Sequence, residues 1–391
     1  MERNGLYFPP AHLTGVSIEP SPITAVDMRT AAFVGVSPRH DTPPGSVRLY
    51  SGWDAFRNEQ LRGVHGGRRW NDIAHAVQGF FLNGGERCYV ANTGIGGSVA
   101  DGLAALAPVE DAAIVVAPAA CDAPEYEAIV RHCEVGYDRM AILDGPSRVD
   151  EVALRLMRGE PADAQAPLWR PPPLAPRGTV ALYTPWIRVA DPEGPAGATV
   201  RVPASGHIAG LWSRLAATHG LSRSPAGESL VGALDVANTF SDGDLSALSA
   251  TGVNTLRLIP GRGVVVWGAR TLSQNLPWRY VAVRRVVNLI SESLRRGTRW
   301  AAYETPSEAV MVAIRRHVGD FLDRLWRQGE LQGASPREAY FVRCDETTTT
   351  AADVRTGTLV LVVGLAVLRP GEFATLTIRQ AEAGAEVVES A

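Results

Sequence analysis

The segment WRYVAVRRVVNLISESLRRGTRWAAYE, residues 278–304, carries the strongest structural signal in this 391-residue sequence. Four of its apolar residues recur at intervals of three and four, which predicts an amphipathic helix over 279–296. They are Val283, Val287, Ile290 and Leu294. A similar stripe predicts a second helix over 307–327, and strands are expected after it at 338–344 and 359–368. The last third of the chain is therefore expected to be a mixed unit of helices and strands.

Outward from this segment towards the N-terminus, short strand-like runs alternate with helical patterns. Strands are expected at 30–36, 47–50, 87–91, 114–117, 140–143, 180–183 and 264–267, and helices at 70–81, 125–133 and 206–219. Such alternation predicts an α/β fold, and uninterrupted apolar strands are typical of parallel sheets buried on both faces. The chain length predicts more than one domain.

The composition excludes several classes of function. The net charge of −3 offers no basic field for nucleic acid or an anionic membrane. All 38 basic residues are arginine, and guanidinium groups suit protein interfaces because they pair with carboxylates at two points. The four cysteines form no C-x-x-C pair, which argues against a zinc site or a disulfide framework. No signal peptide or membrane-spanning run is found, so the chain is expected to fold in the cytoplasm.

Three short motifs could carry chemistry, and each has a simpler explanation. Gly94–Gly97 follows a strand but lacks the third glycine of a dinucleotide loop. Ser205-Gly206-His207 lacks the nucleophile elbow of a hydrolase and is expected to be a turn entering a helix. Asp345-Glu346 is expected to lie in a solvated threonine-rich loop and not to bind a cation. No catalytic residue, cofactor site or metal site is predicted, and the chain is not expected to be an enzyme.

The order of the motifs along the chain points to a known family. The relevant segments are GLYFPP at 5–10, TAAFVGVSPR at 30–39, IAHAVQGFFLNGGERCYV at 73–90, CDAPEYEAIVRHCEVGYDRMAILDGP at 121–146, ALYTPWIRVADP at 181–192, VPASGHIAGLWSR at 202–214, GVNTLRLIPGRGVVVWGARTL at 252–272, the opening segment at 278–304, FLDRLWRQGELQGASPREAYFVRCDETT at 321–348 and LVVGLAVLRPGEFATLTI at 361–378. In this order they resemble the tail sheath proteins of contractile phages, R-type tailocins and extracellular contractile injection systems.

The resemblance implies a multi-domain α/β plan. It comprises an N-terminal arm at 1–29, the N-terminal part of the core domain at 30–92, a middle domain at 93–262, a C-terminal sheath core domain at 263–370, and a C-terminal arm and tail at 371–391. The middle domain is subtilisin-like in topology in this family, but the protease's Asp, His and Ser motifs are missing here, so no peptidase activity follows. The proline-rich stretch 159–178 is longer than the family pattern and is interpreted as a surface decoration.

The resemblance also implies a structural function. Sheath subunits polymerise as stacked rings of six around an inner tube and contract to drive the tube through a target envelope. The implied partners are further copies of the chain, the inner tube protein, and baseplate and tail-terminator or cap proteins, with no nucleic acid and no direct membrane insertion. Assembly is expected in the cytoplasm, in a phage tail-like particle that can be released from the cell. Two alternatives are an α/β hydrolase-like enzyme and an oligomeric binding scaffold that closes into a ring.

Two sets of residues are candidates for contacts between subunits. Strands donated to a neighbouring copy are expected at 16–23 and 373–378, with the acceptor edge near 340–343 or 359–363. Their apolar residues are Val16, Ile18, Ile23, Phe373, Leu376 and Ile378. The candidates for contact with an acidic inner tube are Arg315, Arg316, Arg324 and Arg327, whose simpler interpretation is the solvated face of a helix.

Overall fold

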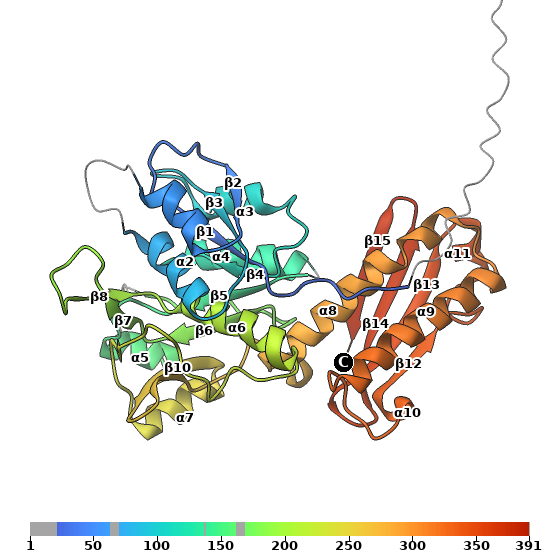
Figure 1. Cartoon of the computed structure of the whole chain (residues 1–391). Helices are drawn as coiled ribbons and strands as arrows, with labels where there is room; N and C mark the ends of the chain where they lie inside the picture. Colours follow the sequence, from blue (N-terminus) through green and yellow to red (C-terminus); the bar gives the residue numbers. More distant parts are fainter. Residues whose placement is uncertain (1–21, 63–69, 137, 162–168, 391) are drawn as a thin grey trace, which may run out of the picture.

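The computed structural model describes residues 22–62, 70–136, 138–161 and 169–390, which form two lobes joined near helix α8 (Val281–Gly297) (Figure 1). The larger lobe is built on an eight-stranded sheet with the order β11-β10-β6-β5-β4-β1-β3-β2. Its six inner strands are parallel, and the two edge strands are antiparallel to their neighbours. The strands are β1 (Ala31–Gly35), β2 (Val47–Tyr50), β3 (Cys88–Asn92), β4 (Ile114–Val116), β5 (Met140–Asp144), β6 (Val180–Thr184), β10 (Val253–Ile259) and β11 (Gly263–Val266).

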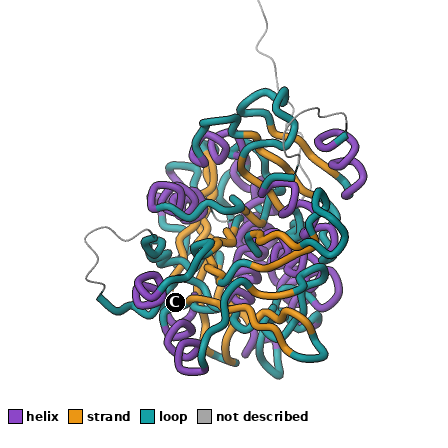
Figure 2. The backbone as a smooth tube through the Cα atoms, turned by 90° about the vertical axis from the view of Figure 1, so that its left-hand side faces the viewer, coloured by secondary structure: helices purple, strands orange, loops and turns teal. Residues whose placement is uncertain are grey.

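Helices cover both faces of this sheet, as the side view of Figure 2 shows. One face packs against α2 (Asp72–Leu82) and α6 (Ser205–His219). The other packs against α3 (Val99–Leu106), α4 (Ala123–Val135), α5 (Glu151–Met157) and α7 (Asp242–Ala250). Every residue of β5 and of β6 is buried, because both faces of these strands are covered. The expected α/β class is confirmed.

Smaller elements lie around the large sheet. A three-stranded sheet with the order β8-β7-β9 comprises β7 (Ile187–Ala190), β8 (Thr199–Val202) and β9 (Asp235–Val236). Short helices are α1 (Trp53–Phe56), which continues into the π-helix η1 (Arg57–Leu61), and the 3-10 turns η2 (Leu276–Trp278) and η3 (Arg299–Tyr303).

The smaller lobe is a four-stranded antiparallel sheet with two long helices. Its order is β12-β13-β14-β15, with β12 (Tyr340–Arg343), β13 (Leu359–Arg369), β14 (Glu372–Ala381) and β15 (Gly384–Ser390). Helices α8 and α9 (Glu308–Arg327) pack on the sheet, and α10 (Pro336–Ala339) and α11 (Ala351–Arg355) are short. The helices expected at 279–296 and 307–327 are thus confirmed, as are the strands expected at 338–344 and 359–368.

The division into sheets differs from the expected domain boundaries. The boundary at 92/93 lies within one sheet, because β1 pairs with β3 on one side and with β4 on the other. The boundary at 262/263 falls in the β10–β11 hairpin, where Ile259 pairs with Gly263. Within the single chain, the segment after 370 forms β14 and β15 of the four-stranded sheet, and its role as an arm between subunits stays a prediction. Sequence periodicity marks strands but does not show which strands share a sheet.

Candidate functional site

Residues 22–30, here called the N-terminal strap, run from the smaller lobe to the start of β1 (Figure 1). The side chain of Ile23 is buried among the apolar residues of the smaller lobe. Its carbonyl accepts a hydrogen bond from Arg324 Nη2 at 2.7 Å, and the N–H of Val26 donates to Ser293 Oγ at 3.0 Å. A Cβ atom at Gly297 would lie 2.8 Å from the Ile23 side chain, so the strap passes directly over the end of α8.

The structure changes the assignment of the two donated strands. Val16 and Ile18 lie outside the described residues, whereas Ile23 packs into its own chain and is not part of a free arm. Phe373, Leu376 and Ile378 lie in β14, which pairs with β13 and β15 of the same chain. Within the single chain, 373–378 is thus a central strand, and its donation to a neighbouring copy stays a prediction. Its Pro370-Gly371 turn, between two strand-like runs, is a hairpin signal that argued for pairing with 359–368.

The two candidate acceptor edges differ in the structure. Strand β12, which contains Tyr340–Arg343, lies at one edge of its sheet and has a single strand partner among the described residues. At the other candidate, 359–363, the Val360 N–H donates to Thr349 Oγ1 at 3.0 Å. The Val360 carbonyl accepts from Thr348 Oγ1 at 2.9 Å. The threonine-rich loop thus covers the part of β13 that extends past β12. Of the two candidate edges, 340–343 is therefore the better candidate to accept a strand from a neighbouring copy.

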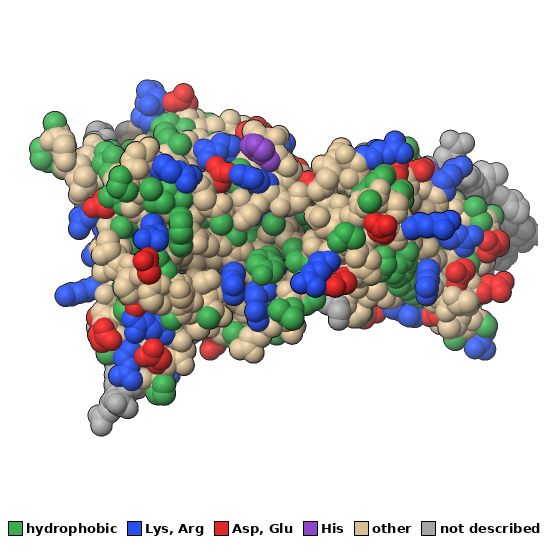
Figure 3. Space-filling view, turned by 90° about the horizontal axis from the view of Figure 1, so that it is seen from below, with side chains coloured by type: hydrophobic (Ala, Val, Ile, Leu, Met, Phe, Trp, Pro, Cys, Tyr) green, Lys and Arg blue, Asp and Glu red, His purple; other side chains and the backbone are tan. Residues whose placement is uncertain are grey.

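The four candidate arginines do not form one patch. Arg315 pairs with Glu308 at 2.8 Å and also donates to the Cys344 carbonyl, while Arg324 binds the strap. Arg327 is 72% exposed and pairs with Asp323 at 2.8 Å. Arg316 is exposed, with Nη2 3.5 Å from His317 Nε2. Over the face in Figure 3, acidic and basic side chains are likewise interspersed.

A buried arginine pair on α8, which the sequence did not single out, lies at the junction of the lobes. Arg284 is fully buried and forms a two-point ion pair with Glu389 of β15, with both N–O distances at 2.7 Å. Its Nε donates to Asn288 Oδ1 at 2.7 Å, and Nη1 donates to the Arg177 carbonyl at 3.2 Å. Burial lowers the pKa of Arg284, and the charge of Glu389 acts against that shift.

The neighbouring Arg285 faces different partners. Its Nη1 donates to the Trp212 carbonyl of α6 and its Nη2 to the Met28 carbonyl of the strap, each at 3.1 Å. The guanidinium also lies 5.2 Å from the centre of the Trp212 ring. Burial lowers the pKa of Arg285 to about 10. The sequence signal for this site is that valines stand on both sides of the arginine pair, so α8 has no wholly polar face there.

The Ser205-Gly206-His207 motif begins α6, as expected, and Ser205 is bonded to a buried carboxylate. Asp144, at the end of β5, accepts from the Ser205 N–H at 3.0 Å and from its hydroxyl at 2.5 Å. Burial raises the pKa of Asp144 to about 7 and lowers that of His207 to about 4. The serine hydroxyl donates to the carboxylate directly, without an intervening histidine, so this arrangement is not a catalytic triad.

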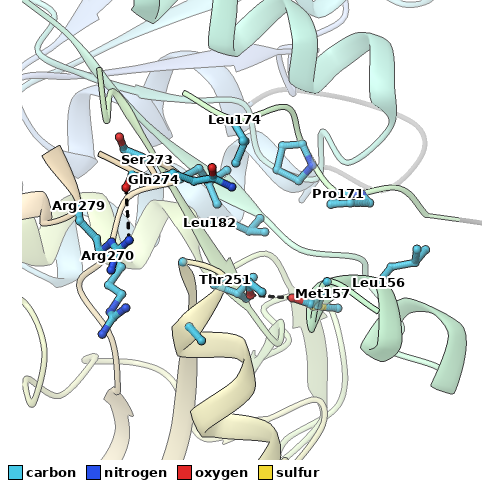
Figure 4. Close-up of a pocket in the computed structure, with 16 residues that line it drawn as sticks. Leu156, Met157, Pro171, Leu174, Leu182, Thr251, Arg270, Ser273, Gln274 and Arg279 are labelled. Atoms are coloured by element: carbon cyan, nitrogen blue, oxygen red, sulfur yellow. Dashed lines mark hydrogen bonds between the residues drawn. The ribbon is translucent and has the colours of Figure 1, made fainter. Parts of the chain in front are cut away.

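A cavity of about 410 Å³ lies beside β6 and α7 (Figure 4). Its walls include Met157, Leu182, Val253 and Leu272, and Arg270 and Arg279 line it as well. Arg279 Nη2 donates to the Gln274 carbonyl at 3.3 Å. The described lining contains no carboxylate, histidine or cysteine, so it offers space for apolar atoms but no general base or nucleophile of those kinds.

Two other kinds of site are absent from the described ranges. No cluster of three or more metal-ligating side chains occurs among these residues. None of the helices in the described part combines the length and apolar character of a membrane span.

Comparison with known proteins gives a consistent family. The phage tail sheath protein central domain matches residues 176–272, and the phage tail sheath C-terminal domain matches residues 273–381. A putative prophage major tail sheath protein of Pseudomonas aeruginosa is 26% identical over 196 residues, which are 49% of this chain and 46% of that protein. The match thus spans less than half the length of this curated relative.

Solved structures extend the likeness of fold over almost the whole chain. The contracted sheath complex of the extracellular contractile injection system PVC has a TM-score of 0.74 at 23% identity, over 95% of this chain and 96% of that one. The contracted helical sheath of the anti-feeding prophage has a TM-score of 0.71 at 24% identity, over 95% and 98%. Because the two matched family regions adjoin and together span more than half of the 391 residues, the chain belongs to the phage tail sheath proteins, which are structural proteins and not enzymes.

Proposed function

We propose that the chain is the sheath subunit of a contractile injection system, which polymerises as stacked rings of six around an inner tube and contracts to drive that tube through a target envelope. The observation that carries this function is the fold match over 95% of the chain to the sheath of a contractile particle in its contracted state. Contraction is then a change between two helical packings of nearly rigid subunits.

The edges of the smaller sheet support strand exchange between copies. An unpaired strand edge exposes backbone N–H and C=O groups, and a strand from another chain can satisfy them. Strand β12 provides such an edge, and β15, at the opposite edge, pairs with a single strand in the described part of the chain and follows a short turn after β14. We therefore assign the donated C-terminal strand to β15, in place of 373–378. Head-to-tail exchange of this kind does not close on itself and generates a helical tube.

The remaining partners follow from the same proposal. The inner tube, baseplate and terminator or cap proteins are the partners of a sheath, and the particle assembles in the cytoplasm before release. The subtilisin-like topology of the middle domain also remains part of the proposal. Arg316 and Arg327 remain candidates for the inner-tube contact, because their side chains are exposed. Arg315 and Arg324 are set aside because each binds a backbone carbonyl of its own chain.

Electron microscopy of the purified full-length chain tests the proposal. Hollow, striated tubes of uniform width are expected at high protein concentration, and deletion of residues 1–21, which keeps the buried Ile23 and the rest of the strap, is expected to leave a folded protein that forms no tubes. Closed rings, at all concentrations and also when tail components are added, would support the binding scaffold instead. Tubes formed by the truncated chain would contradict the role of the N-terminal segment.

A further inference from the structure

Consecutive arginines on α8 hold segments from opposite ends of the chain. Arg284 binds Glu389 in the C-terminal strand β15, and Arg285 binds the Met28 carbonyl in the N-terminal strap. Both guanidinium groups are buried, and no hydrogen bond or ion pair joins the strap to β15 directly among the described residues. Helix α8 is therefore a direct physical link between the strap and β15.

The buried charge of each arginine is compensated largely by the chain segment that it binds, which is β15 for Arg284 and the strap for Arg285. If Glu389 left, Arg284 would keep only neutral acceptors at Asn288 and Arg177 for a fully buried charge. If the strap left, Arg285 would keep one carbonyl, that of Trp212. An uncompensated buried charge is strongly destabilising, so the arginine would have to move towards water. Release of either the strap or β15 therefore disturbs the packing of α8 against its neighbours.

The helix is packed tightly enough to transmit that disturbance. Along α8, every residue from Val283 to Leu294 is buried. Asn288 Nδ2 donates to the Arg139 carbonyl, which precedes β5, and Ser293 Oγ accepts from the strap at Val26. A well-packed helix shifts as a unit, because close-packed neighbours leave little room for a local adjustment.

We propose that α8 couples the N-terminal strap to β15, so that freeing either end weakens the attachment of the other. The property belongs to the single chain and does not depend on the proposed function. In a sheath, it would make the capture of one chain end by a neighbouring copy promote release of the other end. That consequence rests on the proposed function, whereas the coupling itself can be measured without assembly.

Hydrogen exchange of the full-length chain, kept below the concentration at which it assembles, tests the coupling in both directions. Ile23→Ala truncates the most buried apolar side chain of the strap without touching Glu389, and it is expected to speed exchange of the amides at 385–390 at least about fivefold. Glu389→Gln is expected to speed exchange at 23–29 by a similar factor, because coupling free energies are reciprocal. Acceleration confined to the mutated end in both variants would overturn the proposal.

Two further variants separate coupling from general loss of stability. Ile129→Ala truncates an equally buried isoleucine in α4, away from α8, and is expected to leave the exchange at 385–390 unchanged relative to the rest of the smaller lobe. Arg324→Gln removes the bond to the Ile23 carbonyl from α9 and serves where Ile23→Ala fails to fold. An acceleration at 385–390 that is as large in Ile129→Ala as in the strap variant would also overturn the proposal.

Discussion

Asp144 and Ser205 form a closed hydrogen-bonded pair in the core, in which the carboxylate accepts from the serine N–H at 3.0 Å and from its hydroxyl at 2.5 Å. Burial raises the pKa of Asp144 from 3.8 to about 7. The folded state therefore retains a proton that the unfolded chain releases, and stability falls as the pH rises through this window.

Asp144→Asn should remove that dependence, because an amide keeps the shape of the side chain without titrating. Between pH 5 and pH 8, the wild type is expected to lose up to about 3 kcal/mol more unfolding free energy than the variant. Urea unfolding at the two pH values measures the difference. The matched control is Asp345→Asn, whose exposed carboxyl has a pKa lowered by the Thr347 hydroxyl and titrates below this window. Equal slopes in wild type and Asp144→Asn would contradict the prediction.

The ion pair between Glu389 and Arg284 should contribute strongly to stability. Glu389→Gln leaves a buried guanidinium without its carboxylate, which is expected to cost about 3–5 kcal/mol at neutral pH. Burial by itself raises the pKa of Glu389, but the charge and hydrogen bonds of Arg284 outweigh it, so the pKa lies below its usual 4.5. The stabilisation is thus present above pH 4.5 and lost on further acidification.

Thermal and urea unfolding at pH 7 and pH 3 give the corresponding measurement. Glu372→Gln is the control, because Glu372 pairs with Arg369 on the surface and its loss is expected to cost less than about 1 kcal/mol. A wild-type advantage over Glu389→Gln that persists unchanged at pH 3 would show that the charge is not responsible.

Two glycine substitutions should have opposite effects in the smaller lobe. A Cβ at Gly364 would lie 2.0 Å from the Phe341 ring, so Gly364→Ala must displace that ring from its cross-strand position on β12. The expected loss is about 1–3 kcal/mol. At Gly319, within α9, a Cβ would meet no atom within 4 Å, and alanine should stabilise the helix by about 0.5–1 kcal/mol. Calorimetry of both variants tests the pair, and equal shifts in Tm would contradict it.

Locking β15 to β14 should block assembly if β15 is the donated strand. Thr377 and Val388 are paired across these strands, so Thr377→Cys with Val388→Cys places two thiols at facing positions. The oxidised protein is expected to form no tubes, and reduction should restore them, as seen by electron microscopy. Disulfide-locked protein that assembles as readily as reduced protein would exclude the exchange of β15. The single Val388→Cys variant controls for the substitution at the exposed edge.

Local patterns in the sequence predicted the helices and strands well, but they did not predict which strands pair with one another. The stripe at Val283, Val287, Ile290 and Leu294 identified α8, because burial on one side imposes a helical period. The alternation around Leu376 and Ile378 identified a strand, yet the same alternation suits an exchanged edge and a central strand. The strand partner is set by tertiary contacts, which periodicity does not contain.

The buried polar contacts were the least predictable part. Arg324 binds the carbonyl of Ile23, 301 residues away, and nothing near either residue in the sequence points to the other. The valines beside Arg284 and Arg285 indicate that this face of α8 is not wholly polar, but nothing in the sequence identifies Glu389 and the Met28 carbonyl as their partners. Charged residues normally lie on the surface of a protein, but these two arginines are buried at the junction of the lobes.

The N-terminal strap also imposes an order on biosynthesis. Its partners at Arg285, Ser293 and Arg324 lie 257, 267 and 301 residues further along the chain. During translation, the strap leaves the ribosome long before these residues exist, whereas β1 can pair with β3 after about sixty residues have followed it. Ile23 therefore cannot pack into the apolar core of the smaller lobe until the last quarter of the chain has been made. Docking of the strap is therefore a late event of folding, which can take place only after most of the chain has been synthesised.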